Sequence, residues 1–221
     1  MLVDLKVAQL LCSRLCHDLV GPIGAVNAGM ELMSDGTDDM DGAIALVAGS
    51  GQQLKRCVIF YRLAFGIGAG GRASVADARM LAGELLSEGP VALEWLDPAV
   101  PGPGRVICVD GMKLLLNMVL LCVDSLPRGG ILAVGVANLA QGTGVVMTAS
   151  GVGARFRGEV RTAMGPDFPA GELSARTVQG YFAARLAERL GTAIKVSDID
   201  EGKVQLASVL PSPGGGVSNL S

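Results

Sequence analysis

The feature that most constrains the fold is the helical spacing of apolar residues over the first 64 positions. From Val7 to Met33 such residues recur every three or four positions without any alternation of period two, which predicts one long helix over residues 4–34. The segment SDGTDDMDG, residues 34–42, is dense in turn and N-cap residues, and helical spacing returns from Met40 to about Ala64. We therefore expect an antiparallel helical hairpin.

The first of these helices contains a proline in its interior. Pro22 lacks a backbone N–H and clashes with the carbonyl four residues earlier, that of Asp18, so a kink is expected there. Just before this point lies His17, the single histidine of the chain. A helix with this pattern places an imidazole next to a bend.

The two helices are too apolar to cover each other. The stretches LVGPIGAV and VIFYRLAF are apolar nearly all round, whereas a two-helix hairpin buries only one stripe of each helix. The simplest partner is a second copy of the chain, so we expect a homodimer whose two hairpins form a four-helix bundle.

The pattern changes after GIGAGGRAS, residues 66–74, which is typical of a linker. We expect helices near residues 75–87, 111–125 and 175–190, a strand at 91–96, a β-hairpin around AQGTG, and two final strands, AIKVSDI and VQLASVL. These elements predict an α+β fold: a hairpin domain at 1–67, an α/β sandwich at 68–211, and a disordered tail at 212–221.

Composition excludes several classes of function. Half of the residues are hydrophobic and 18% are charged, which is far from the composition of a disordered chain. The net charge of −3 offers no excess of positive charge for binding nucleic acid. The apolar runs are shorter than a bilayer span needs, and Asp4 and Lys6 interrupt any signal-peptide pattern. We expect a soluble, cytoplasmic protein that binds neither nucleic acid nor membrane.

The five cysteines are odd in number and scattered through apolar patterns, which favours free thiols. Cys12 and Cys16 are one helical turn apart and adjoin His17, so a metal or redox site has to be considered. Neighbouring residues on a helix point about 100° apart, and the sequence offers no second pair of ligands. We predict no metal site and assign no role to these two cysteines.

The segment HDLVGPIGA resembles the phosphoacceptor box of sensor histidine kinases, His-Asp/Glu-Leu-Arg-Thr-Pro-Leu, with Val20 and Gly21 in place of its Arg and Thr. The second half resembles the ATP-binding domain of those kinases. The asparagine box of those kinases is matched by NMVLLCVDSLPRGGILAV, and their first glycine box is matched by ASGVGA. The order of the elements also agrees. The resemblance implies a phosphotransfer hairpin followed by an ATPase-like domain.

Three departures from the kinases concern the nucleotide. The glycine-box aspartate that binds adenine in the kinases is Ala149 here, which offers no acceptor. The asparagine that holds Mg²⁺ is Leu121, which cannot ligate a hard cation. The second glycine box is replaced by TVQG. The ATP-binding-like domain is therefore interpreted as degenerate.

A kinase-shaped dimer that keeps the histidine and loses the ATP site resembles the alphaproteobacterial histidine phosphotransferase family, ChpT. That resemblance implies that His17 accepts and donates a phosphoryl group without ATP, that Asp18 assists as acid or base, and that a partner receiver domain brings Mg²⁺. It implies a CckA-like hybrid kinase receiver as donor and CtrA-like and CpdR-like response regulators as acceptors, in cell-cycle control.

Several further residues are candidates for receiver docking. Counting back from a turn near residues 35–37 places Gln52, Lys55 and Arg56 roughly level with His17, with Arg14 one turn before it and Val20 just after it. Gly21 and Gly24 either leave room for a receiver or let helices pack tightly. Two other functions remain open: an ATP-dependent kinase core, and a non-catalytic protein that docks receivers.

Overall fold

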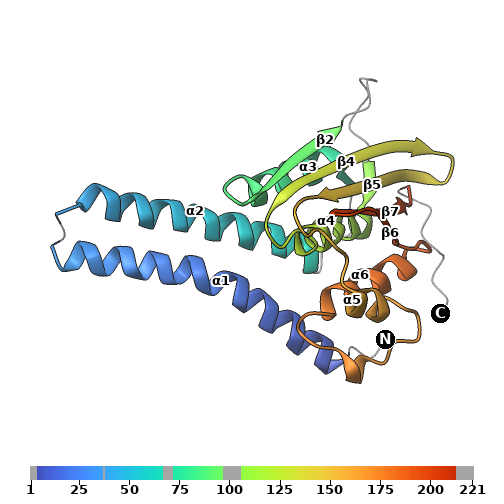
Figure 1. Ribbon diagram of the computed structural model, residues 1–221, viewed down its shortest axis with the longest axis horizontal. Helices are drawn as coiled ribbons and strands as arrows, with labels where there is room; N and C mark the ends of the chain where they lie inside the picture. The colour runs from blue at the N-terminus through green and yellow to red at the C-terminus, as the bar shows by residue number, and fades with distance from the viewer. Residues whose placement is uncertain (1–3, 37, 67–71, 97–105, 213–221) are drawn as a thin grey trace.

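The computed structural model describes residues 4–36, 38–66, 72–96 and 106–212. A long helical hairpin projects from a compact α/β unit (Figure 1). The predicted α+β class, a helical hairpin followed by an α/β sandwich, is confirmed.

The hairpin consists of α1 (Leu5–Ser34) and α2 (Met40–Phe65), and both begin where an aspartate caps the helix. Asp4 accepts a hydrogen bond from the backbone N–H of Lys6, and Asp39 accepts one from that of Gly42. Helix α1 continues through Pro22, which is buried, and changes direction about midway along its length (Figure 1). The predicted long, proline-containing helix is thus present.

Helices α1 and α2 come close together at Gly29. A Cβ atom there would lie 2.6 Å from Val47 Cγ2 and 3.2 Å from the carbonyl oxygen of Ala43. Glycine is therefore required at this point of the hairpin, because any side chain would push α2 away.

The α/β unit is built on a five-stranded sheet of order β2-β4-β5-β7-β6. Its strands are β2 (Val91–Leu96), β4 (Gly130–Leu139), β5 (Gly142–Ser150), β6 (Lys195–Asp200) and β7 (Lys203–Leu210). Strand β2 runs parallel to β4, while the other neighbours are antiparallel, so the two predicted β-hairpins are β4–β5 and β6–β7.

Helices α3 (Val75–Leu86) and α4 (Val109–Asp124) pack against this sheet, and α6 (Val178–Arg189) packs against α4. Helix α4 is the central one, with Leu114, Leu115 and Leu116 fully buried. Phe60 and Ala64, near the end of α2, are buried in the same cluster. The hairpin is therefore anchored in the core of the α/β unit through the last turns of α2.

The remaining elements were not predicted: β1 (Arg72–Ser74), β3 (Val106–Cys108), α5 (Gly158–Ala163) and the 3₁₀ turn η1 (Ala170–Glu172). Within the described residues, strands β1 and β3 form a separate two-stranded sheet. Three-residue strands carry too little periodicity for recognition, and β1 lies within the segment that its glycines mark as a linker. The predicted boundary at 67/68 and most of the predicted tail fall outside the described residues.

Among the described residues, no helix is both long and apolar enough to cross a bilayer.

Candidate functional site

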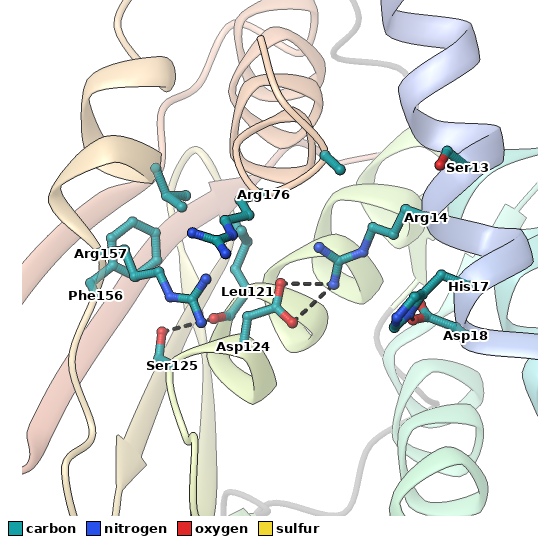
Figure 2. A pocket seen from close by; sticks show the side chains of 12 residues that line it. Ser13, Arg14, His17, Asp18, Leu121, Asp124, Ser125, Phe156, Arg157 and Arg176 are labelled. Carbon is teal, nitrogen blue, oxygen red and sulfur yellow. Dashed lines mark hydrogen bonds and ion pairs between the residues drawn. The ribbon is translucent and has the colours of Figure 1, made fainter. Parts of the chain in front are cut away.

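His17 lies on the face of α1 that looks across a cleft toward the α/β unit (Figure 2). Its side chain is 88% exposed. Its Nδ1 lies 3.4 Å from Asp18 Oδ1, and no hydrogen bond to Nε2 is formed within the described part of the chain. A macromolecular partner can therefore reach the Nε2 atom directly.

Asp18 lies beside the imidazole although the two residues are neighbours in sequence. Its Oδ1 faces His17 Nδ1, and its Oδ2 accepts a hydrogen bond of 2.8 Å from the phenol of Tyr61. The carboxylate side chain is 30% exposed. An acceptor in this position favours the tautomer with the proton on Nδ1, which leaves the Nε2 lone pair as the nucleophile.

Tyr61 was not identified as a site residue from the sequence. It belongs to α2, is partly buried, and its ring lies against those of Phe60 and Phe65 at centroid distances of 6.1 and 6.0 Å. Burial, and next the negative charge of Asp18, raise the pKa of its phenol far above the usual range. Tyr61 therefore remains a neutral hydrogen-bond donor to Asp18.

The cleft beside His17 has a volume of about 410 Å³ and lies between α1 and the α/β unit. Its second wall comes from the end of α4, from α5 with the residues before it, and from the approach to α6 (Figure 2). The lining residues are Ser13, Arg14, His17, Asp18, Leu121, Asp124, Ser125, Phe156, Arg157, Val160, Ala175 and Arg176.

Arg14 spans this cleft and joins its two walls. One nitrogen of its guanidinium lies 2.9 and 2.7 Å from the two carboxylate oxygens of Asp124, at the end of α4. Burial raises the pKa of Asp124, an effect that the Arg14 guanidinium opposes. Arg14 is thus engaged within the chain, and its predicted contact with a receiver stays a prediction.

The positions that correspond to the nucleotide ligands of kinases are apolar and buried. Ala149 is fully buried on β5, between Leu132 and Val204 of the neighbouring strands. Leu121 is 2% exposed on α4. Neither side chain offers an acceptor for adenine or a ligand for Mg²⁺, so the residues present do not fit a kinase-type ATP site.

Asn117, the first residue of the asparagine-box resemblance, is also buried. Its side-chain amide donates to the carbonyls of Ala64 and Lys113, at 2.9 and 2.8 Å, and its Oδ1 accepts from Gln179. Asn117, on α4, therefore connects the last turn of α2 with α6. All polar atoms of its side chain form hydrogen bonds inside the core.

The glycines after His17 are not needed for packing within one chain. A Cβ at Gly21 or Gly24 would meet no atom of the described chain within 4 Å, in contrast to Gly29. Val20, beside them, is 65% exposed. Val20, Gly21 and Gly24 form an exposed surface with small side chains, one to two helical turns after His17.

The structure corrects the predicted level of the α2 residues. Tyr61 lies opposite Asp18. Gln52, Lys55 and Arg56 lie on earlier turns of α2, nearer the turn that connects the two helices. A simple fold-back count assumes straight helices, and α1 is bent at Pro22. Gln52 and Lys55 are exposed, and Arg56 forms an ion pair with Glu88 at 2.6 Å.

The cysteines next to the site, Cys12 and Cys16, are exposed free thiols. Across the residues that the structure describes, no three His, Cys, Asp or Glu side chains come together as a metal site would require.

Comparison with known proteins shows the family of this chain. Residues 75–202 match the family model of the histidine phosphotransferase C-terminal domain. The chain is 34% identical over 198 residues to protein phosphotransferase ChpT of Brucella abortus (strain 2308), covering 87% of this chain and 90% of that protein.

Solved structures agree with this assignment. A bacterial phosphotransferase superposes with a TM-score of 0.78 at 32% identity, covering 94% of this chain and 98% of that one. The catalytic domain of histidine kinase ThkA superposes with a TM-score of 0.50 at 14% identity, over 66% of this chain and 100% of that one, which shows a shared fold. The chain therefore belongs to the histidine phosphotransferase family and is a ChpT-like member of it.

Proposed function

We propose that the protein relays a phosphoryl group between receiver-domain aspartates through phospho-His17, in a two-component phosphorelay that uses no ATP. The observation that carries this proposal is the exposed imidazole at the cleft, whose Nδ1 lies beside a carboxylate while Nε2 has no hydrogen-bond partner among the described residues. The membership of the chain in a phosphotransferase family supports the same reaction.

In this reaction the chain supplies the nucleophile, His17, and the carboxylate that stabilises its charge, Asp18. The Nε2 lone pair of His17 attacks the phosphorus of an aspartyl phosphate, a P–N bond forms, and the P–O bond to the aspartate breaks with the carboxylate as leaving group. The proton on Nδ1 stays in place, and the Asp18 carboxylate stabilises the positive charge that develops on the ring. The reverse sequence passes the group to a second receiver, and each receiver supplies the Mg²⁺.

The nucleotide positions support the absence of an ATP-dependent step. Buried Ala149 and Leu121 replace the residues that would hold adenine and Mg²⁺. The α/β unit then serves to shape the second wall of the cleft, opposite His17.

Charge and shape around the cleft support docking of a receiver. Val20, Gly21 and Gly24 offer a low, open surface on α1. Arg157 and Arg176 lie on the opposite wall of the cleft, and Arg155 lines the adjoining hollow that shares these two residues. The phosphorylation pocket of a receiver is acidic, so this wall complements it, with Gln52, Lys55 and Arg56 as more distant candidates.

Exposed apolar residues on the hairpin support a homodimer. Eleven large apolar side chains of α1 and α2 are more than a third exposed: Leu5, Val20, Ile23, Met30, Leu32, Met33, Met40, Ile44, Leu46, Val58 and Leu63. A second hairpin packed against this surface would complete a four-helix bundle and remove much of it from water.

The ChpT-like identity leads us to propose the partners as well. The donor would be the receiver of a CckA-like hybrid histidine kinase, and the acceptors CtrA-like and CpdR-like response regulators, in cell-cycle control in the cytoplasm.

The test is transfer from a purified receiver carrying radiolabelled aspartyl phosphate. The wild-type chain should take up label with the alkali stability of phosphohistidine, and His17→Gln should take up none while still binding the receiver. Equal labelling of His17→Gln would overturn the assignment of the acceptor, and receiver binding without labelling of the wild type would show a docking protein instead.

A further inference from the structure

A hydrogen-bonded chain of three side chains crosses from α2 to α1 at the histidine. The Tyr61 phenol donates to Asp18 Oδ2 at 2.8 Å, and Asp18 Oδ1 faces His17 Nδ1 at 3.4 Å. Both carboxylate oxygens are therefore committed, one to each partner. This arrangement fixes the carboxylate plane relative to the imidazole.

Tyr61 is the rigid end of this chain. Its ring is held between Phe60, which is fully buried, and Phe65, whose ring lies 5.5 Å from that of Phe182 on α6. The position of the phenol is thus set by the core of the α/β unit. Asp18, by contrast, lies on α1 next to an open cleft and, without the phenol, would be free to turn toward water.

The direction of the carboxylate decides which nitrogen of His17 is the nucleophile. A carboxylate beside Nδ1 stabilises the tautomer protonated there and leaves the lone pair on Nε2, which has no hydrogen-bond partner among the described residues. The apo distance of 3.4 Å is long for a hydrogen bond, and such contacts shorten when charge develops on the ring.

We propose that Tyr61 is a positioning residue for phosphotransfer: it holds the Asp18 carboxylate against Nδ1 of His17 and so keeps Nε2 available as the nucleophile. This proposal rests on the phosphotransfer function proposed above. It assigns a role to a residue of the second helix that does not itself touch the transferred group.

The test uses the fact that His17 is the only histidine, so its ring nitrogens give isolated NMR signals. In Tyr61→Phe the population of the Nδ1-protonated tautomer should fall, and label uptake from a phosphorylated receiver should slow by about three- to tenfold, which corresponds to the loss of one hydrogen bond of ordinary strength. The other tyrosine provides the control: Tyr181→Phe should change neither quantity.

A double-mutant cycle separates positioning from a general loss of structure. If Tyr61 acts through Asp18, Tyr61→Phe should slow transfer in the wild-type background and add nothing in the Asp18→Ala background, where no side-chain acceptor for the phenol remains. Equal slowing in both backgrounds, or an unchanged tautomer population in a folded Tyr61→Phe protein, would overturn the proposal. The NMR readout needs no phosphate donor, so it decides the role of Tyr61 even if wild-type His17 fails to accept label.

Discussion

Asn117 shows how a residue of a nucleotide motif can serve the core of the fold. Its amide donates to carbonyls at the end of α2 and within α4, and its oxygen accepts from Gln179 of α6. The asparagine that the sequence resemblance highlights thus belongs to a buried polar network, and it is fully withdrawn from solvent.

We expect Asn117→Ala to lower the free energy of unfolding by about 2–3 kcal/mol, because it leaves the Ala64 carbonyl and the Gln179 amide buried without partners. Denaturant unfolding measures this change. Asn27, exposed on α1, is the matched control, and Asn27→Ala should change stability by less than about 0.5 kcal/mol. Equal effects of the two substitutions would contradict the role of the network.

Tyr61 gives the protein a specific sensitivity to alkali. Burial, with the Asp18 charge, raises the phenol pKa in the folded state above the value of about 10 in the unfolded chain. Above about pH 10 the unfolded chain releases a proton that the folded chain retains, so stability falls as the pH rises. Tyr61→Phe should lose stability less steeply in this range, as thermal unfolding at several pH values would show; identical slopes would refute this.

At the scale of elements, the hairpin depends on one glycine and tolerates others. A Cβ at Gly29 would meet the stiff, β-branched Val47 at 2.6 Å, whereas one at Gly24 would meet nothing of the described chain within 4 Å. The two positions lie on the same helix, so they form a matched pair.

We expect Gly29→Ala to destabilise the protein by about 1–3 kcal/mol through overpacking. Gly24→Ala should stabilise it by about 0.5–1 kcal/mol, since alanine favours a helix over glycine. Thermal unfolding of the two variants decides between the explanations for Gly24. A destabilised Gly24→Ala protein would indicate tight helix packing in the dimer, and a stabilised protein that docks receivers less well would indicate an opening for the partner.

Sequence patterns predict the elements whose periodicity is long and strong. The two hairpin helices, α4 with its run of leucines, and the β4–β5 hairpin all lie within a few residues of their expected bounds. The parallel pairing of β2 with β4 was not predicted, because the sequence does not show which strand a six-residue segment will join. The short helix α5 was missed for the same lack of pattern.

At the scale of the whole molecule, the site is made where hairpin and α/β unit meet. The motif around His17 is visible in sequence, whereas Tyr61 beside Asp18 and the Arg14–Asp124 ion pair across the cleft depend on how a bent α1 lies against α2 and α4. Such contacts join residues far apart in the chain, and no local pattern encodes their register.

The exposed apolar surface of the hairpin predicts a dimer. Ile44 on α2 is 48% exposed, and Ile44→Glu should convert dimers to monomers, because burying a carboxylate in the bundle is costly. Gln53→Glu adds the same charge at an exposed polar position of α2 and should leave the dimer intact. Light scattering measures the mass of each variant, and a dimeric Ile44→Glu protein would contradict a bundle formed through this face.

The central claim is that phosphate reaches His17 from a receiver and not from ATP. The direct measurement incubates the wild-type chain with Mg²⁺ and radiolabelled ATP alone, and in parallel with a receiver carrying labelled aspartyl phosphate. The structure, with buried Ala149 and Leu121 at the nucleotide positions, predicts label on His17 only in the second reaction. Label on His17 from ATP alone would contradict the account and show an autokinase.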